Sequence, residues 1–285
     1  MTRRKEHDMG RLEGRTAMIT GAARGQGRSH ALTLAAEGAS VVAVDLCADL
    51  ATIPYPLATP EDLAETKRLV ESLGVRCHTV QGDVRDTDAI EGAAADAVSR
   101  FGSLDIAVAN AGVCGFGKFW ELDDRSWDEM IGVDLTGVFK TMRAVVRPML
   151  EQGSGRIVAT SSMGGRMGNP NLAHYVAAKW GVIGLVKTLS LETASSGITV
   201  NAVCPATVDT AMVHNEAFYG LFCPELTAPS KSEVESAYAA MSPMGVPWVS
   251  PEEISKSVLY LASDDARFVS GTTIEVSTGA SASMP

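Results

Sequence analysis

Short apolar runs alternate with longer helical patterns along almost the whole chain, and this alternation limits the possible folds most. The strand-like runs are residues 16–20, 40–45, 76–81, 104–109, 156–161, 198–203 and 272–276. Helical patterns lie between them, for example over residues 26–37, 87–101, 125–150 and 172–193. A strand whose side chains are apolar on both of its faces belongs in a sheet that is covered by other elements on both faces. The order predicts right-handed βαβ crossovers and an α/β fold with a doubly wound parallel sheet.

The chain length and charge narrow the class of protein. With 285 residues and 46% hydrophobic content, the chain can bury one large core. Its formal net charge of −10 argues against a nucleic-acid partner or an anionic membrane surface. We therefore expect a small soluble substrate.

The cysteines and the N-terminus indicate the compartment. The five cysteines are scattered without a Cys-x-x-Cys pair, which argues against a disulfide framework or a structural zinc site. We expect them to be buried thiols in a reducing compartment. Residues 1–15 lack the apolar core of a signal peptide, and no segment approaches the ~20 apolar residues of a membrane span. These features predict a cytoplasmic protein.

The predicted domain organisation is simple. Residues 1–11 are expected to form a flexible polar arm, and residues 12–285 a single domain. Two segments are longer than the connections between strands and helices of such a sheet require. Residues 46–60 carry three prolines and resemble an insertion after the second strand, and residues 208–249 are rich in aromatic residues and methionine. Most of the latter side chains are expected to pack within a helical subdomain, and a few to form an apolar lid over the substrate.

A glycine-rich turn follows the first predicted strand. Gly21, Gly25 and Gly27 let the backbone approach a pyrophosphate, and the helix that follows offers free N–H groups and partial positive charge. Asp45 ends the next strand, 18 residues beyond Gly27, near the spacing of an acid that binds the adenosine ribose. A carboxylate there favours NAD(H) over NADP(H), whereas Arg24 could in principle meet a 2′-phosphate.

The third and fourth strands end in segments that suit the same cofactor. In Gly82-Asp83-Val84 the carboxylate can meet the adenine amino group, and in Asn110-Ala111-Gly112 small residues admit the cofactor. Each segment taken alone is compatible with an ordinary turn. Their shared position at strand ends predicts a dinucleotide site.

Tyr175 and Lys179 lie one helical turn apart, and Ser162 lies thirteen residues upstream of Tyr175. A tyrosine with its usual pKa near 10 is a poor base, and we expect the nearby ammonium to lower that pKa. Ser162 would donate a hydrogen bond to the substrate oxygen. The pair alone is common on helices, and Ser162 could instead be a helix cap. Together with the glycine turn, these residues predict a nicotinamide-dependent oxidoreductase.

Other polar residues are given no catalytic part. His174 precedes Tyr175 but faces elsewhere on the helix, so we expect a surface or packing role for it. No His, Cys or carboxylate residues cluster at metal-ligand spacing, which predicts no catalytic metal.

Taken together, these motifs resemble the shorter branch of the short-chain dehydrogenase/reductase family. The resemblance covers residues 12–279 and implies a single-domain Rossmann-type fold with helices on both faces of the sheet, NAD(P)-linked alcohol or carbonyl chemistry and a homotetramer. It also implies that Lys179 holds the nicotinamide ribose and joins a proton relay. The matching positions put further residues beside the cofactor: Gln26, Leu46, Pro205, Val208 and Thr210.

A narrower likeness is to the carveol-dehydrogenase-like, mycofactocin-coupled enzymes of actinobacteria. It rests on residues 44–47, 55–63, 204–210, 215–216 and 247–249. It implies a small apolar alcohol or ketone, such as a terpenoid, and a tightly held NAD. The electron partner would then be the peptide-derived redox cofactor mycofactocin.

One position departs from the family pattern. Where the family usually has an asparagine that helps to place a water of the proton relay, this chain has Asp134. An ionised aspartate accepts hydrogen bonds but cannot donate one. We expect Asp134 to pair with Lys179 and to support a working but altered relay.

Two alternatives remain. A catalytically idle NAD-binding regulatory module is the rival from another class, and Asp134 is its sole support in the sequence. A fatty-acyl or sugar reductase on the same fold would differ in substrate only, and the apolar character of residues 208–249 argues against a sugar.

Overall fold

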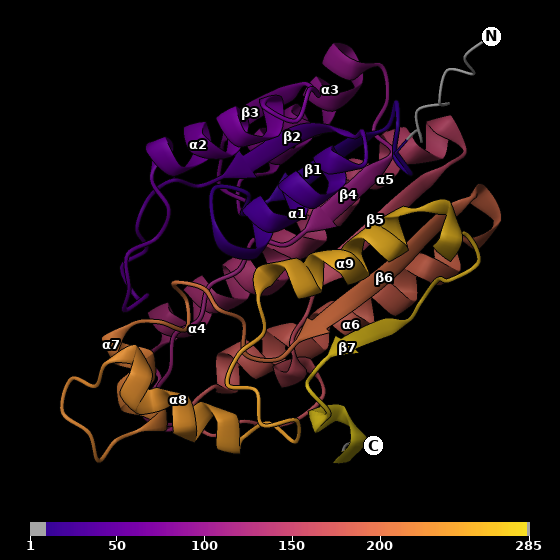
Figure 1. The fold of residues 1–285 in the computed structure, drawn as a ribbon. Helices are drawn as coiled ribbons and strands as arrows, with labels where there is room; N and C mark the ends of the chain where they lie inside the picture. Colours follow the sequence, from indigo (N-terminus) through magenta and orange to yellow (C-terminus); the bar gives the residue numbers. More distant parts are fainter. Residues whose placement is uncertain (1–9, 284–285) are drawn as a thin grey trace, which may run out of the picture.

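The computed structural model describes residues 10–283, and the predicted arm lies outside them except for Gly10 and Arg11. The centre of the fold is a seven-stranded parallel sheet with the order β3-β2-β1-β4-β5-β6-β7 (Figure 1). The strands are β1 (Thr16–Thr20), β2 (Ser40–Asp45), β3 (Cys77–Gln81), β4 (Ile106–Ala109), β5 (Gly155–Thr160), β6 (Ile198–Pro205) and β7 (Thr273–Val276). The predicted doubly wound fold is confirmed.

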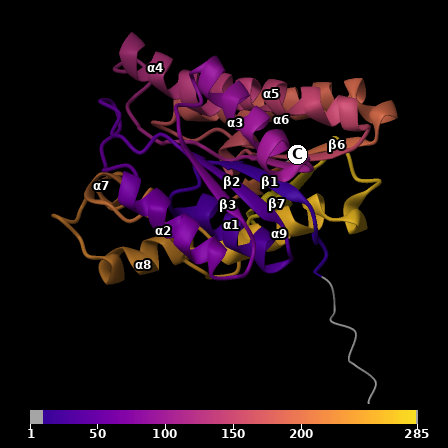
Figure 2. The same ribbon diagram turned by 90° about the horizontal axis from the view of Figure 1, so that it is seen from above.

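Successive residues of a strand enter two different cores, as the apolar runs require. In β1, Ala17 and Ile19 face one core, whereas Met18 faces the other. The first core lies under α1 (Gly25–Ala36), α2 (Pro60–Glu71) and α9 (Pro251–Ala262). The second lies under α3 (Thr87–Phe101), α5 (Val138–Gln152) and α6 (Ala173–Glu192). Figure 2 shows the sheet between these two helical layers.

The helix predicted over residues 125–150 is interrupted. The structure has α4 (Asp124–Ile131), a π-helical segment (Gly132–Gly137) and then α5. A Cβ on Gly137 would lie 2.5 Å from a Val84 methyl, so the segment packs tightly against the end of β3. Wide turns of this kind occur often at functional sites, and this one carries the buried Asp134.

Two segments extend the domain beyond the sheet. Residues 46–60, called the insertion here, run as a loop from β2 to α2. Residues 208–249, called the lid, contain α7 (Glu216–Phe222) and α8 (Lys231–Ala240), which lie together beyond the sheet in Figure 1. The lid has a small core of its own, centred on Tyr219 and Tyr238.

The structure also describes the cysteines and the beginning of the domain. All five cysteines are buried and free. Arg11, at the end of the predicted arm, pairs with Glu37 at 3.2 Å. Within residues 10–283, no helix combines the length and apolarity that a membrane crossing requires.

Candidate active site

Two cavities meet at the carboxyl ends of the strands, where the strand order reverses between β1 and β4. Ligands bind at this position in open α/β sheets. The smaller cavity has a volume of about 160 Å³ and the larger about 520 Å³. Both are lined by Gln26, Asn110, Gly112, Thr210 and Met212. This shared boundary is called the junction below.

The structure brings every predicted site residue to one of the two cavities. The smaller one is lined by Gly21, Arg24, Gly25, Gln26, Gly27, Asp45, Leu46, Asp83, Val84, Asn110, Ala111, Gly112 and Thr210. The larger one is lined by Asp134, Ser162, Tyr175, Lys179, Pro205 and Val208.

The glycine turn has the geometry that its sequence requires. Gly21 and Gly25 have φ values of +66° and +55°, a region that residues with a side chain rarely adopt. A Cβ on Gly27 would lie 1.9 Å from the Gly21 carbonyl oxygen. Arg24 caps α1 without a side-chain hydrogen bond to its first turn. The first N–H groups of α1 therefore remain available to an anion.

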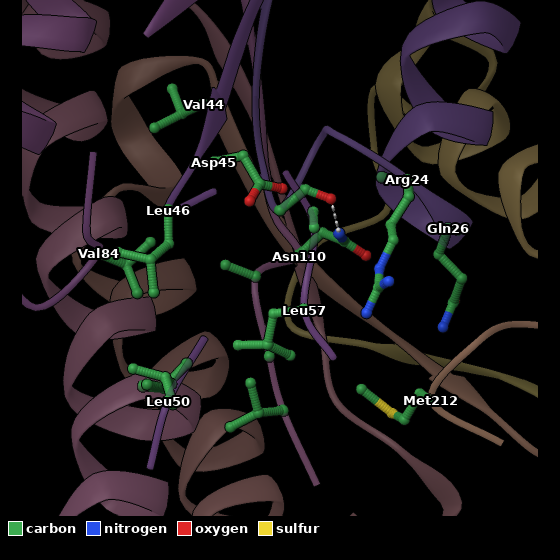
Figure 3. Close-up of a pocket in the computed structure, with 18 of the residues that line it drawn as sticks. Arg24, Gln26, Val44, Asp45, Leu46, Leu50, Leu57, Val84, Asn110 and Met212 are labelled. Atoms are coloured by element: carbon green, nitrogen blue, oxygen red, sulfur yellow. Dashed lines mark hydrogen bonds between the residues drawn. The ribbon is translucent and has the colours of Figure 1, made fainter. Parts of the chain in front are cut away.

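Asp45 and Arg24 are held in the smaller cavity by different contacts. Asp45 accepts hydrogen bonds from the backbone N–H groups of Ala23 at 2.9 Å and Cys47 at 3.1 Å. Each carboxylate oxygen keeps a lone pair for a further donor. Arg24 instead donates to the Pro56 carbonyl oxygen at 2.5 Å, so its guanidinium fastens the insertion. Figure 3 shows Arg24 and Gln26 on one side of this cavity, Leu46, Leu50 and Val84 on the other, and Leu57 between them.

The insertion forms a wall of the smaller cavity, a role that the sequence analysis did not assign to it. It contributes Ala48, Leu50, Tyr55, Leu57 and Ala58 to the lining. The signal that could have found them is their position directly after Asp45, at the end of β2.

Besides Arg24, further contacts fix the insertion. Its Thr52 donates from the backbone N–H and the hydroxyl group to Glu129 of α4, at 3.0 and 2.6 Å. The Tyr55 hydroxyl accepts a hydrogen bond from the backbone N–H of Cys114 at 3.0 Å. At the far end, Thr59 and Asp62 form a capping box that starts α2.

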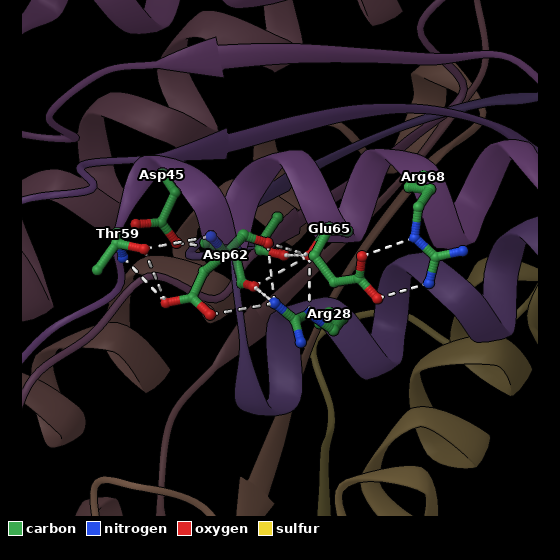
Figure 4. Close-up of polar contacts among 9 residues, drawn as sticks. Arg28, Asp45, Thr59, Asp62, Glu65 and Arg68 are labelled. Atoms are coloured by element: carbon green, nitrogen blue, oxygen red, sulfur yellow. Dashed lines mark hydrogen bonds and ion pairs between the residues drawn. The ribbon is translucent and has the colours of Figure 1, made fainter.

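Arg28 of α1 then ties α2 to the glycine turn. It donates to the Asp62 carbonyl oxygen at 2.8 Å and to the Thr66 hydroxyl group at 2.9 Å (Figure 4). The insertion is thereby held at both of its ends.

Asp83 lies in the smaller cavity, but its carboxylate already has a strong partner. Arg85 contacts both carboxylate oxygens, with its closest contact at 2.7 Å. Burial raises the pKa of Asp83, but the bonds from Arg85 outweigh it and leave the pKa below its usual value. The contact with adenine that the sequence predicts would have to be shared with this ion pair.

Ser162, Tyr175 and Lys179 converge at the larger cavity. Ser162 follows β5 in extended conformation, and its hydroxyl group accepts a hydrogen bond from the Gly164 N–H at 3.0 Å. Lys179 lies one turn after Tyr175 on α6, and its Nζ is 5.5 Å from the centre of the Tyr175 ring. The arrangement puts two hydroxyl groups and one ammonium group in one cavity.

Lys179 forms a buried ion pair with Asp134, as the sequence predicts. Its Nζ lies 3.0 Å from Oδ2 of Asp134 and donates to the Thr160 carbonyl oxygen at 3.2 Å. The other oxygen of Asp134 accepts from the Val113 N–H at 2.8 Å. Burial raises the pKa of Asp134, and Lys179 and the Val113 N–H oppose that rise. The ammonium group thus has one hydrogen-bond partner, the Thr160 carbonyl, beside its ion pair with Asp134, and it retains donor capacity for a ligand.

The expected lowering of the Tyr175 pKa is wrong for this structure. Burial raises the pKa of Tyr175 well above its usual value, and the nearby Cys114 and Asp134 add to the rise, whereas the bond to Ser162 opposes it. The physical reason is first the burial of the phenol, which disfavours its charged form, and then the negative charge of the nearby Asp134. Near neutral pH the phenol therefore keeps its proton.

The rest of the larger cavity is mostly apolar. Asp134 and Lys179 are the only charged residues among its lining residues within the described chain, and they neutralise each other. The lid contributes Met212, Val213, Phe218, Phe222, Tyr238, Met241, Val246 and Trp248. The C-terminal segment adds Ser277, Thr278 and Ala280, which the sequence analysis missed.

The structure also describes the residues that were given no catalytic part. His174 is buried and lines neither cavity, and burial lowers its pKa. Over residues 10–283, no group of three or more His, Cys, Asp and Glu side chains is arranged to hold a metal ion.

Comparisons with known proteins agree with this geometry. The profile described as short chain dehydrogenase matches residues 15–217. The (-)-trans-carveol dehydrogenase of Rhodococcus erythropolis is 42% identical over 95% of this chain and 99% of its own. The crystal structure of carveol dehydrogenase from Mycobacterium avium in complex with NAD is 46% identical with a TM-score of 0.94, covering 95% and 99% of the two chains. A short chain dehydrogenase from Mycobacterium paratuberculosis bound to NAD is 35% identical with a TM-score of 0.87, covering 96% and 100%.

The profile match spans more than half of the chain, and the relatives match over nearly their full length. The resemblance that the glycine turn and the Tyr175/Lys179 pair predict is therefore confirmed. This chain belongs to the short-chain dehydrogenase/reductase family.

Proposed function

We propose that this protein is an NAD-dependent dehydrogenase or reductase that acts on a small apolar secondary alcohol or ketone. The observation that carries the proposal is the position of Ser162, Tyr175 and Lys179. They line an apolar cavity that meets, at the junction, a second cavity suited to a dinucleotide. An alcohol in the larger cavity would lie between the hydroxyl groups and the nicotinamide.

The residues divide the chemistry between them. NAD, when bound, supplies the hydride acceptor for alcohol oxidation. Tyr175 takes the hydroxyl proton of the alcohol, or gives a proton to the ketone in the reverse direction. Ser162 bonds to the same oxygen and fixes its position. The remaining donor capacity of the Lys179 ammonium would bind the nicotinamide ribose. Since burial raises the pKa of Tyr175, the positive charge of the oxidised nicotinamide would favour the phenolate during oxidation.

Individual residues of the smaller cavity suit NAD. The buried Oε1 atom of Gln26, at the junction, has no hydrogen-bond partner among the described residues. A Cβ on Gly21 would lie 2.8 Å from the Cα of Ala111, so the backbone forms a close cradle. Asp45 would bind the ribose hydroxyl groups and repel a 2′-phosphate, while Arg24 is engaged by Pro56. At the far side of the junction, Val208 and Thr210 would meet the carboxamide.

The character of the substrate follows from the larger cavity. Its aromatic and methionine lining, together with a neutral ion pair, favours an uncharged and apolar molecule. Two of the relatives are named carveol dehydrogenases. A terpenoid alcohol or ketone fits both observations.

Asp134 has a place in the proposed proton relay. From the π-helical segment it pairs with Lys179, which donates to the Thr160 carbonyl oxygen and lines the same cavity as the hydroxyl groups of Ser162 and Tyr175. We propose that it supports a working relay in the position where related proteins have an asparagine. A catalytically idle regulatory module would not need the hydroxyl groups of Ser162 and Tyr175 together with the ammonium group of Lys179.

The insertion supports a tightly held cofactor. Apolar side chains of the insertion cover the smaller cavity, and Thr52, Tyr55 and Arg24 anchor it on three sides. A cofactor that cannot exchange with the free pool has to pass its electrons to another carrier while it stays bound. Mycofactocin is the electron partner that we propose for that step. The buried free cysteines fit a reducing compartment such as the cytoplasm.

The anchor at Glu129 allows a test of cofactor retention. Glu129 lines neither cavity, yet it accepts two hydrogen bonds from Thr52. The Glu129→Ala variant is expected to release NAD about tenfold faster, because hydrogen bonds to a charged group contribute ~1.5–3 kcal/mol. Stopped-flow displacement of NADH measures this rate. Asp128→Ala, on the exposed face of α4, is the control; equal release from both variants contradicts the role of the insertion.

A homotetramer is the assembly that we propose. Trp180 and Leu191, three turns apart on α6, are 52% and 80% exposed, with the exposed Gly184 between them. On the other helical layer, Phe268 is 88% exposed. Such faces mark contact surfaces, and two different faces are what a tetramer with two kinds of interface needs. Light scattering is expected to give the mass of four chains, and a monomer mass contradicts the proposal.

The overall function is tested on purified protein that has not been dialysed. Mass spectrometry and absorbance are expected to find bound NAD(H), and secondary terpenoid alcohols are expected to reduce it. Oxidation of alcohols with free NAD, from an initially empty protein, would keep the enzyme function and remove the mycofactocin step. Bound NADP(H) would overturn the role given to Asp45. Cofactor binding with no turnover of any alcohol or ketone would favour the idle module.

A further inference from the structure

The buried carboxylate of Asp134 lies at the junction of the two cavities. Asp134 is fully buried; its Oδ1 accepts a hydrogen bond from the Val113 N–H at 2.8 Å, and its Oδ2, which has no hydrogen-bond partner among the described residues, lies 3.0 Å from Nζ of Lys179 as an ion pair. Gly112 lines both cavities, and a Cβ built on it would lie 3.1 Å from Oδ2 of Asp134 and 3.2 Å from Nζ of Lys179. The ion pair therefore lies directly behind the backbone that separates the two cavities.

The charge of this pair acts on whatever occupies the junction. Asp134 and Lys179 are the only charged side chains among the described residues that line the larger cavity. Without Asp134, the ammonium group of Lys179 would be an uncompensated positive charge in a buried site. With Asp134, the pair is close to neutral. The carboxylate thus adds one negative charge to the site and makes the local electrostatic potential more negative.

An oxidised nicotinamide ring carries a positive charge, whereas the reduced ring is neutral. We infer that Asp134 sets the redox potential of the bound cofactor by stabilising its oxidised form over its reduced form. This inference rests on the proposed function, which brings the nicotinamide to the junction beside Tyr175 and Lys179. The cofactor accepts a hydride from the alcohol carbon and later gives up the same two electrons. A lower potential makes the reduced cofactor the stronger hydride donor, toward a ketone or toward a second carrier.

The size of the effect depends on the distance between the two charges. At an effective dielectric constant of about 20, two unit charges at a separation on the order of 8 Å would shift the balance between the two forms by roughly thirtyfold. Solvent in the open part of the cavity weakens the interaction. We therefore expect about a tenfold shift, which for a two-electron couple corresponds to about 30 mV.

The test is a redox titration of the bound nicotinamide in the purified holoenzyme, followed by its absorbance, which works whether or not the cofactor exchanges. Asp134→Asn keeps the size of the side chain and removes the charge. Its midpoint potential is expected to rise by about 30 mV relative to the wild type. Asp128→Asn removes the same charge from the exposed face of α4 and is expected to leave the potential unchanged.

The outcomes separate this inference from the proposed function. An unchanged potential in an Asp134→Asn enzyme that binds NAD and turns over alcohol overturns the inference alone, because Asp134 would then be protonated or electrostatically remote. A wild-type protein that binds no nicotinamide and oxidises no alcohol overturns the proposed function. Asp134→Ser keeps an acceptor for the Val113 N–H and has to shift the potential in the same direction; a shift of opposite sign also overturns the inference.

Discussion

Replacing Tyr175 with phenylalanine is expected to lower kcat for alcohol oxidation by about a thousandfold, while NAD binding stays within about twofold of the wild type. The substitution removes one oxygen atom and keeps the buried ring. Proton transfer at the substrate oxygen then loses its partner, because Ser162 is too weak a base to replace the phenol. Steady-state kinetics and calorimetric titration with NAD measure the two quantities.

A matched control is available on the same protein. Tyr55 is also buried and lines the smaller cavity, and Tyr55→Phe loses only the hydrogen bond from the Cys114 N–H. This variant is expected to retain chemistry and to change cofactor release. If Tyr175→Phe kept full turnover, Tyr175 would not be the proton-transfer group. If both the wild type and the variant bound NAD but turned over no substrate, the idle-module alternative would gain support.

The fold could be predicted from the sequence because its signals are local. Strands such as Thr16–Thr20 and Ser40–Asp45 begin and end at the same residues as the apolar runs in the sequence. The glycine turn could be located as well, because Gly21 and Gly25 have positive φ values and a Cβ on Gly21 or Gly27 would collide with the backbone. Parallel strands then carry Asp45, Asn110 and Ser162 to one edge of the sheet.

What could not be predicted depends on side-chain contacts and burial, most of them between distant segments and one between close neighbours. The insertion covers the cofactor cavity through bonds from Thr52 to Glu129 and from Cys114 to Tyr55, which local patterns do not encode. Asp83 is engaged by Arg85, which the sequence analysis did not pair with it. The direction of the Tyr175 pKa was mispredicted because it depends on burial and on the negative charge of the nearby Asp134.

Replacing Lys179 with methionine is expected to abolish turnover and also to destabilise the fold. Asp134 would then be a fully buried carboxylate without its cation. Removal of one partner from a buried ion pair costs about 3–5 kcal/mol. For a chain of this size, that corresponds to a fall in Tm of roughly 10 °C near neutral pH. Lys187→Met, on the exposed side of the same helix, is the control and is expected to leave Tm unchanged.

The pH dependence of Tm in the Lys179→Met variant tests whether the buried charge of Asp134 causes the loss of stability. In Lys179→Met, burial raises the pKa of Asp134 above the usual value of 3.8, and no ammonium group opposes the rise. A carboxyl group whose pKa is higher in the folded state binds its proton more tightly there. The variant is therefore least destabilised below about pH 4, and it loses stability as the pH rises through the raised pKa. The double variant Asp134→Asn/Lys179→Met has no charge to bury and is expected to recover most of the lost Tm at about pH 8. Equal Tm values for the single and double variants across this range would show that the buried charge is not the source of the loss.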